Sequence, residues 1–394
     1  MIETIHHWVK EINSPLWNGL IFLLLGTGIF FTLATGFVQF RLFGRSVREM
    51  LGGRKAVSDP HGITPFQAFV TGLASRVGVG NIAGVAIAIA NGGPGAVFWM
   101  WVTALIGMSS AFAESSLAQL FKIRDHDSGQ FRGGPAYYIR TGLKQNWLAV
   151  LFSLSLIFCF GLVYNAVQAN TMVAAAKNSW GWNEHAFGVG LVILTAPIIF
   201  GGIRRVSRVA EMLVPVMAVL YLAMALYIVA TNLAQVPHVF GLIFDNAFNF
   251  NAAGGGILGG LISVAMEQGI KRGLYSNEAG QGSAPNAAAA ADVKHPVSQG
   301  MIQMLGVFVD TIIVCSCTAF IVLLSTDVPA GLKGAELTQA AIAGHVGAWG
   351  AHFLTVVLFM FAYSTIIGNY AYAESNVQFI NSHWLTMAVF RTAV

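Results

Sequence analysis

Two amide side chains stand three residues apart inside a long apolar run. Asn165 and Gln168 lie in the string VYNAVQAN, and residues at this spacing share one face of a helix. Each amide offers both donors and acceptors, so the pair can bind the carboxylate and the ammonium of a zwitterion without carrying charge. The alternative is hydrogen bonding to a neighbouring helix, which is a common use of amides in membranes.

Two adjacent hydroxyls, Ser364 and Thr365, lie in another apolar run, FAYSTIIGN. A hard cation such as Na⁺ takes oxygen ligands, and these hydroxyls could supply them together with carbonyls released from a broken helix. The alternative is that each hydroxyl bonds to a carbonyl of its own helix. Composition alone favours this alternative.

Charged side chains inside apolar runs form a third group. Arg76 lies about ten residues into one run, and a charge at that depth is a functional hypothesis by default. It could instead face a water-filled cytoplasmic vestibule or pair with a carboxylate such as Glu267. The acidic residues in or beside apolar runs are interpreted as ion-pair members near span ends rather than as a proton relay, although Glu267 and Asp310 could lie deeper; these residues are Glu114, Glu211, Glu267, Asp310 and Glu374.

The stretch that must position these groups runs from Phe66 to Trp101. Gly78, Gly80 and Gly84 interrupt it, and each costs roughly 1 kcal/mol against alanine in a helix interior. Irregular backbone within a bilayer must line protein or a wet cavity. A glycine-interrupted segment therefore indicates a substrate site near the midplane. The alternative is an unbroken helix with glycines for close packing.

The composition predicts an all-α polytopic membrane protein in a lipid bilayer. The 394 residues are 56% hydrophobic and 10% charged, whereas soluble proteins carry about 25% charged residues. The net charge of +4 does not indicate nucleic-acid binding. The three cysteines all lie in apolar runs, which favours buried thiols over a disulfide or a metal site. No catalytic motif is present, so an enzyme is not expected.

Nine apolar runs have the length of a membrane span, and a tenth begins near residue 384. The nine cover 16–38, 66–90, 95–120, 147–175, 186–203, 210–231, 255–272, 299–325 and 350–378. Of the 21 Lys and Arg residues, 16 fall in the loops after the first, third, fifth and seventh runs. Basic loops are cytoplasmic, which predicts an N-terminus outside the cell and a plasma (inner) membrane location.

The seventh run carries a second glycine-rich interruption, AAGGGILGGL, with Gly255, Gly256 and Gly259. It enters the membrane from the outside, whereas the second run enters from the cytoplasm, and an inverted repeat requires such opposite directions. One transporter domain, 1–394, would then hold an extra first helix (16–38), a first repeat (64–232) and an incomplete second repeat (250–394). The last run is too short for a core of about 30 Å, which predicts a truncated chain or an end that docks differently.

Two connecting segments are also predicted. The loop from Ser276, SNEAGQGSAPNAAAAADVKHP, is expected to form a tightly packed cytoplasmic turn. The segment from Glu336 to Val346 is expected to be a short amphipathic helix over the outer entrance.

Three strings in this sequence resemble the alanine or glycine:cation symporter family. They are GNIAGVAIAIANGGPGAVFWMW from Gly80, GGPAYYI from Gly133 and RGLYSNEAGQGSAPNAAAAA from Arg272. The resemblance implies the leucine-transporter fold, with five-plus-five inverted repeats preceded by one extra helix. It also implies Na⁺-coupled uptake of small neutral amino acids, chiefly alanine and glycine, with Na⁺ as coupling ion and no organic cofactor.

The resemblance further implies site residues, carried over by position. The sodium ligands would be the carbonyls of Ala74, Val77 and Phe361 with the hydroxyls of Ser364 and Thr365. The residues implied or considered for the amino acid are Ser75, Gly78, Val79, Gly80, Asn81, Asn165, Gln168, Gly255, Gly256 and Gly259. Arg76 departs from the small residue of the wider fold, which argues against copying a second sodium site at Asn81.

The sequence therefore predicts a symporter that works by alternating access. The alternatives are a proton-coupled or other small-solute transporter of the same fold, or an inactive truncated fragment. A membrane-embedded enzyme or scaffold subunit would need a polar catalytic cluster or other marker, which the sequence does not provide. The oligomeric state is not predicted.

Overall fold

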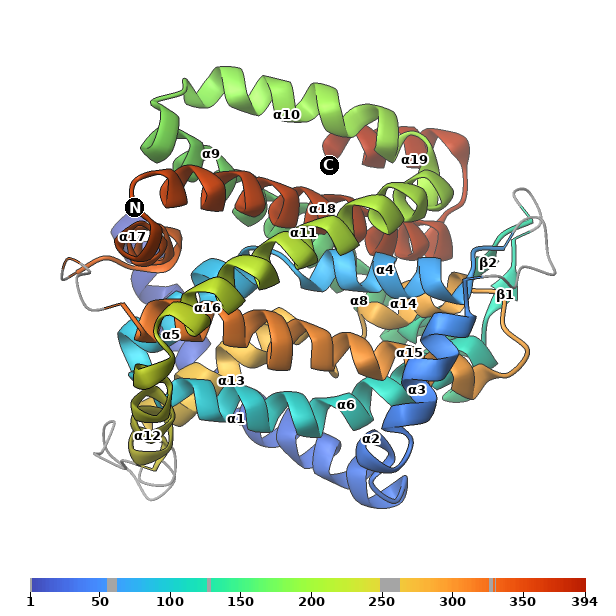
Figure 1. Cartoon of the computed structure of the whole chain (residues 1–394). Helices are drawn as coiled ribbons and strands as arrows, with labels where there is room; N and C mark the ends of the chain where they lie inside the picture. The colour runs from blue at the N-terminus through green and yellow to red at the C-terminus, as the bar shows by residue number, and fades with distance from the viewer. Residues whose placement is uncertain (1, 55–61, 126–128, 249–262, 326–328, 330) are drawn as a thin grey trace.

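The computed structural model describes residues 2–54, 62–125, 129–248, 263–325, 329 and 331–394. These residues form one bundle of helices with a small hairpin at one end (Figure 1). The hairpin pairs β1 (Ile123–Arg124) with β2 (Phe131–Arg132) in antiparallel register. This end of the bundle, called the hairpin end below, also holds α2 and α3, whereas α12 and α17 lie at the opposite end (Figure 1).

The helices follow the predicted order of spans. The first part contains α1 (Ile2–Ala34), α2 (Val38–Arg41), α3 (Phe43–Gly52), α4 (Pro65–Arg76), η1 (Gly80–Gly84), α5 (Val85–Gly92), α6 (Ala96–Leu120), α7 (Pro135–Gly142), α8 (Asn146–Leu156), η2 (Ile157–Val163), α9 (Tyr164–Trp180), α10 (Glu184–Ile199) and α11 (Gly202–Thr231). The second part contains η3 (Leu233–Gln235), α12 (Val236–Ala247), α13 (Val264–Asn277), α14 (Ala284–Ala290), α15 (Pro296–Val307), η5 (Phe308–Cys315), α16 (Ser316–Leu323), α17 (Gly334–Val346), α18 (Trp349–Ile380) and α19 (Trp384–Ala393).

Within the described residues, six helices are long and apolar enough to cross a membrane, and one bent pair makes a seventh. The bent pair joins 65–76 to 80–92 at an angle of 50°. The predicted fifth span is the shorter apolar helix α10. Among the residues that the structure describes, three of the predicted spans contain a π-helical segment, namely η1, η2 and η5.

Some predicted boundaries are wrong. The sixth span begins earlier than predicted, because α11 starts at Gly202 and takes Arg204, Arg205 and Arg208 into its first turns. The loop after the first span is itself mostly helical, since α2 and α3 occupy it. The predicted amphipathic segment is α17, whose Thr338 Oγ1 approaches the Ile82 carbonyl of η1 at 3.3 Å.

Close helix packing holds the centre of the bundle together. The helix α6 packs against α13 and α15, and glycines allow the approach. A methyl group at Gly300 would lie 2.7 Å from the Phe112 carbonyl oxygen, and one at Gly269 would lie 2.7 Å from Trp99 Cβ. Small residues at such crossings let backbones come close, which drives helix association in lipid.

Candidate functional site

The predicted interruption of the second span is confirmed. Thr64 and Gln67 form a capping box and Pro65 occupies the first turn, so the start of α4 is firmly fixed. The helix ends at Arg76, because Val77 takes φ −78° and ψ 91°, outside the helical region. The chain resumes a helical path at Gly80. The carbonyl of Val77 is therefore turned away from the regular helical pattern.

The long helix α18 runs beside the break (Figure 1). Two glycines make this crossing possible. A methyl group at Gly78 would lie 3.2 Å from Thr365 Cβ and closer still to its hydroxyl oxygen. A methyl group at Gly368 would lie 2.7 Å from the backbone nitrogen of Ser75. Neither glycine has a positive φ, so the close approach, and not the backbone conformation, accounts for both.

The crossing brings together the five oxygens that the resemblance implies as sodium ligands. Thr365 Oγ1 lies 3.1 Å from the Ala74 oxygen, 3.3 Å from that of Val77 and 3.0 Å from that of Phe361. Ser364 Oγ lies 3.3 Å from the Ala74 oxygen and 2.8 Å from that of Phe361. All five residues are buried. We call this group the five-oxygen cluster.

The five-oxygen cluster contains more acceptors than protons. Each hydroxyl supplies one proton, whereas each carbonyl oxygen supplies only lone pairs. Thr365 Oγ1 faces three carbonyls and can donate to one of them at a time. The excess of lone pairs makes a negative potential within a buried site. Oxygen ligands of this kind suit a hard cation, so the residues present fit Na⁺.

The backbone amides at the break have partners within the protein. The Gly78 N–H donates to Asn81 Oδ1 at 2.8 Å, and the Val79 N–H donates to Gln168 Oε1 at 3.0 Å. Gly78 and Val79 are among the residues that the resemblance implied or the sequence suggested for the amino acid. In this conformation Asn81 and Gln168 occupy the two amides, so a ligand at either amide would have to displace a side chain.

One tyrosine, Tyr275, lies against the broken span, and a second, Tyr164, packs against Tyr275. A methyl group at Gly80 would lie 3.2 Å from the Tyr275 ring. The rings of Tyr164 and Tyr275 meet edge to face with centroids 5.2 Å apart. Because Gly80 has no side chain, the Tyr275 ring can pack directly against the irregular backbone. We call the paired rings of Tyr164 and Tyr275 the aromatic wall.

Asn165 is hydrogen-bonded to its own helix and to α18. Its Nδ2 donates to the Gly161 carbonyl at 3.2 Å, and its Oδ1 accepts from Asn369 Nδ2 at 3.0 Å. Asn369 Oδ1 in turn accepts from Ser75 Oγ at 2.6 Å. The helix-to-helix alternative therefore describes this conformation of Asn165, and Ser75 joins it in one polar chain.

Two of the interpretations offered for Arg76, an open vestibule and a pair with Glu267, are wrong. Arg76 is 2% exposed and so does not face an open vestibule. Glu267 pairs with Lys271 instead. Arg76 Nη1 donates to the Gln303 carbonyl at 3.2 Å, while Nε and Nη2 have no hydrogen-bond partner among the described residues. The guanidinium lies against Gly306, which has no side chain to obstruct it.

Three buried carboxylates, Asp310, Glu114 and Glu278, lie close enough to Arg76 to feel its charge. Asp310, which is fully buried, accepts hydrogen bonds from Asn81 Nδ2 at 2.6 Å and from Ser276 Oγ at 2.9 Å. Glu114 accepts from two backbone amides, and Glu278 lies in the turn after α13. The charge of Arg76 acts on all three carboxylates. Asp310 therefore lies within its span rather than at the end, which is the deeper position that the sequence left open for it.

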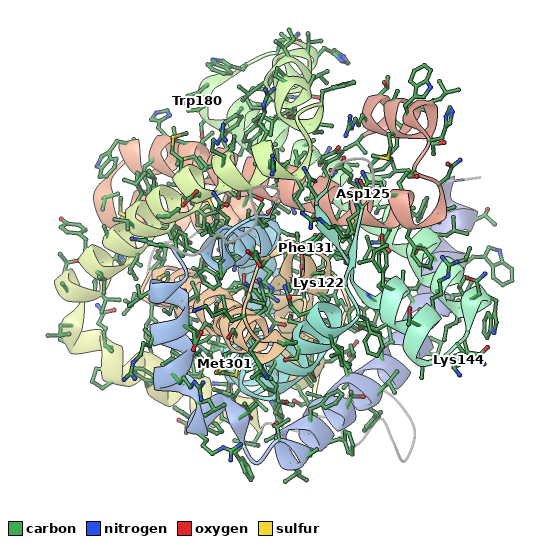
Figure 2. All side chains as sticks on the ribbon, turned by 90° about the vertical axis from the view of Figure 1, so that its right-hand side faces the viewer. Lys122, Asp125, Phe131, Lys144, Trp180 and Met301 are labelled. Atoms are coloured by element: carbon green, nitrogen blue, oxygen red, sulfur yellow. The ribbon has the colours of Figure 1, made fainter. Side chains whose placement is uncertain are left out.

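The predicted tight turn after α13 packs at the hairpin end. Every residue of α14 is buried, and Lys122 Nζ donates to the Ala291 carbonyl at 2.8 Å while lying 4.1 Å from the Phe131 ring centroid. Figure 2 looks onto this end, with Lys122 and Phe131 near its centre. A cavity beside α14 is lined by Asn286, the Glu374–Arg391 ion pair and the hairpin.

The remaining predicted site residues, Gly255, Gly256 and Gly259, lie outside the described residues. Sequence reasoning missed Asn369, Tyr164, Tyr275 and Glu278 as members of the site. Tyr164 adjoins Asn165, Asn369 ends the string FAYSTIIGN, and Tyr275 and Glu278 lie in the string RGLYSNEAGQGS. For Tyr275 and Glu278 the position inside a family string was a usable signal, but only the fold shows that they meet the broken span.

A bundle of apolar helices around an interrupted span, with polar groups buried at the interruption, defines a polytopic membrane protein of the transporter class. Comparison with known families agrees, because the model of the sodium:alanine symporter family matches residues 2–394. The chain belongs to this family, whose members are transporters and not enzymes.

Three relatives illustrate the similarity. An uncharacterized transporter of Haemophilus influenzae is 60% identical, and the alignment covers 100% of this chain and 82% of the relative. The amino-acid carrier protein AlsT of Bacillus subtilis is 49% identical over 97% of this chain and 81% of its own length. The probable sodium/glutamine symporter GlnT of the same organism is 46% identical over 100% and 81%.

Proposed function

We propose that this protein couples the entry of Na⁺ to the uptake of small neutral amino acids, chiefly alanine and glycine. The five-oxygen cluster is the observation that carries the proposal. Its carbonyls come from the break after α4 and its hydroxyls from α18, so a bound Na⁺ would hold the two elements together. The family description, which names sodium and alanine, supports the same pairing of ion and substrate.

The amino acid would bind on the other side of the break, between Gly80, Gln168 and the paired tyrosines. Gln168 would leave the Val79 amide to a substrate carboxylate and turn its own amide toward the ligand. The aromatic wall would limit the side chain that fits. Na⁺ at the neighbouring cluster would order the break and so prepare this site.

Alternating access then supplies the transport cycle. We propose that α4 and α18 separate at the hairpin end to release ion and substrate to the cytoplasm. The basic loops support the cytoplasmic assignment of that end and an N-terminus outside, in the plasma (inner) membrane. The five-plus-five inverted repeat stays a prediction, because the second glycine-rich interruption lies outside the described residues.

Uptake of labelled alanine into proteoliposomes tests the proposal. We expect uptake that depends on an inward Na⁺ gradient and falls to the level of empty vesicles when choline replaces Na⁺. Undiminished uptake in choline would refute sodium coupling and favour a proton-coupled transporter. No uptake under either condition would favour another solute or an inactive chain.

A counterflow panel tests the substrate class. Vesicles loaded with unlabelled alanine, glycine, serine, glutamine or leucine would exchange against labelled alanine. We expect alanine and glycine to exchange fastest and leucine not at all. Glutamine belongs in the panel because the relative GlnT is named as a probable glutamine symporter, and fastest exchange with glutamine would refute the small-substrate assignment.

A further inference from the structure

The hydrogen-bond contacts of Glu278 are satisfied only if its carboxyl group is protonated, whereas Glu114 and Asp310 can make their contacts as ionised carboxylates. Glu278 is 3% exposed and lies between α13 and α14. Its Oε1 lies 2.9 Å from Ser75 Oγ, and its Oε2 lies 2.6 Å from Ser283 Oγ. Ser75 therefore touches two oxygens, that of Glu278 and that of Asn369 at 2.6 Å. A single hydroxyl proton cannot serve both contacts.

The orientation of the amides decides which contact Ser75 serves. The Gly161 carbonyl can only accept, so the NH₂ group of Asn165 must face it. Asn165 then presents its oxygen to Asn369, and Asn369 presents its NH₂ group in return. The oxygen of Asn369 is left facing Ser75. Ser75 must donate its proton there, because two oxygens at 2.6 Å without a proton between them repel each other.

It follows that the Ser75–Glu278 contact needs a proton from Glu278. An ionised carboxylate only accepts, whereas a protonated one has an O–H donor. With the proton on Oε1, Glu278 donates to Ser75, Ser75 donates to Asn369, and Ser283 donates to Oε2. All three contacts are then hydrogen bonds. With Glu278 ionised, one of the three is a contact between two acceptors.

The two neighbouring carboxylates differ in this respect. Glu114 accepts from the backbone N–H groups of Gly280 and Gly282 at 3.4 and 3.2 Å, and such groups can only donate. Asp310 accepts from the amide of Asn81 and from two hydroxyls. Both carboxylates therefore have donors for a negative charge, and the positive charge of Arg76 acts on both of them and on Glu278.

Burial favours the neutral form of any of these carboxyl groups, so the hydrogen-bond pattern, and not burial, distinguishes Glu278. Burial raises the pKa of Glu278 to about 7, although the Arg76 charge and the two serine contacts oppose the rise. The titratable groups that face it from the surrounding elements are Arg76 of α4, Glu114 of α6, Tyr164 of α9, Tyr275 of α13, Asp310 of η5 and Tyr372 of α18.

We propose that Glu278 is a proton-binding site that is filled while α4 and α18 are in contact and emptied when they separate. Ser75 follows Ala74 in α4. The same helix therefore contributes a carbonyl to the five-oxygen cluster and, through Ser75, contacts Glu278. Separation removes Asn369 from Ser75 and frees the Ser75 hydroxyl to donate to an ionised Glu278. The proton passes to water at the hairpin end. This inference rests on the proposed separation of the two helices during transport.

Infrared spectroscopy of the purified full chain tests the proton directly. We expect the carbonyl band of a protonated carboxylic acid near neutral pH in the wild type, its loss in Glu278→Gln, and its retention in Glu114→Gln. Glutamine keeps the shape of a protonated carboxyl group and can donate to Ser75, so the variant should fold. A band of equal intensity in all three proteins, or none in the wild type below neutral pH, would overturn the proposal.

A second measurement uses the wild type and so does not depend on a variant's folding. Na⁺ and alanine are added together to the protein in weakly buffered, mildly alkaline detergent solution with a pH dye. Closure of α4 on α18 should take up protons from the medium. No proton uptake under these conditions would contradict the assignment, provided that calorimetry on the same sample shows Na⁺ and alanine binding.

Transport gives the third readout. Wild-type uptake should vary with internal pH by up to about tenfold per pH unit, the limit for one titrating group, and Glu278→Gln should lose most of this dependence. An unchanged pH profile in the variant would refute the site. Absence of sodium-dependent uptake by the wild type would instead overturn the proposed function, and the infrared bands would still decide where the proton lies.

Discussion

We expect Gly78→Ala to impair sodium coupling more than an alanine at any other glycine of the broken span. The added methyl would lie 3.1 Å from Gln168 Oε1 and 3.2 Å from Thr365 Cβ, and closer still to the Thr365 hydroxyl. Thr365 would have to turn its hydroxyl away and leave the five-oxygen cluster. Overpacking a close site costs about 1–3 kcal/mol. Since about 1.4 kcal/mol is a tenfold change, the Na⁺ concentration for half-maximal uptake should rise about 5- to 150-fold.

The assay is a Na⁺ titration of alanine uptake in proteoliposomes, with protein amount and melting temperature checked for each variant. Gly84→Ala is the matched control in the same span, because a methyl there meets nothing nearer than 4.0 Å. It should titrate like the wild type. A Gly78→Ala protein with wild-type half-saturation and maximum rate would refute the reasoning, since the cluster would then have no part in sodium binding.

Three further predictions concern other contacts. Thr365→Val keeps the shape of the side chain and removes its oxygen. Sodium affinity should therefore fall about tenfold, the equivalent of about 1–2 kcal/mol for a lost buried polar contact. Isothermal calorimetry measures the affinity, and an unchanged value would count against Thr365 as a ligand. Gly300→Ala should lower the melting temperature, because its methyl would press on the α6 backbone, whereas Gly188→Ala has open space around it and should not; equal melting temperatures would contradict the packing argument. Arg391→Gln breaks the ion pair between Arg391 of α19 and Glu374 of α18. We expect a loss of about 1–3 kcal/mol in stability, measured as faster proteolysis of the C-terminal segment. Cleavage at the wild-type rate would show that apolar contacts alone hold α19.

Much of the architecture was predictable from the sequence because the bilayer constrains it so strongly. Apolar run lengths placed most spans, and the glycines of RVGVGN placed the break. The boundary at Gly202 was missed because a helix that begins beyond the membrane carries polar residues, as Arg204 and Arg208 show. Hydropathy reports the solvent that surrounds a residue and does not report where the helical backbone begins.

The site was only partly predictable, for a different reason. Composition disfavoured Ser364 and Thr365 as ligands, because a hydroxyl in a helix usually bonds to its own carbonyl. Both hydroxyls do approach the Phe361 carbonyl of their own helix, yet they also face the broken span. Glu278 was read as a loop residue since its string is rich in small residues. Whether a polar group is buried depends on what packs over it, which no local pattern contains.

The π-helical segments change the rotational phase of the spans that contain them. Each such segment adds about one residue to a turn, and one residue corresponds to about 100° of rotation in an α-helix. In the span from Asn146 to Trp180, the lipid-facing positions before the π-helical segment therefore do not continue in the same register after it. A tryptophan scan through that span should show tolerated positions that keep one periodicity up to Ile157 and resume out of step after Val163.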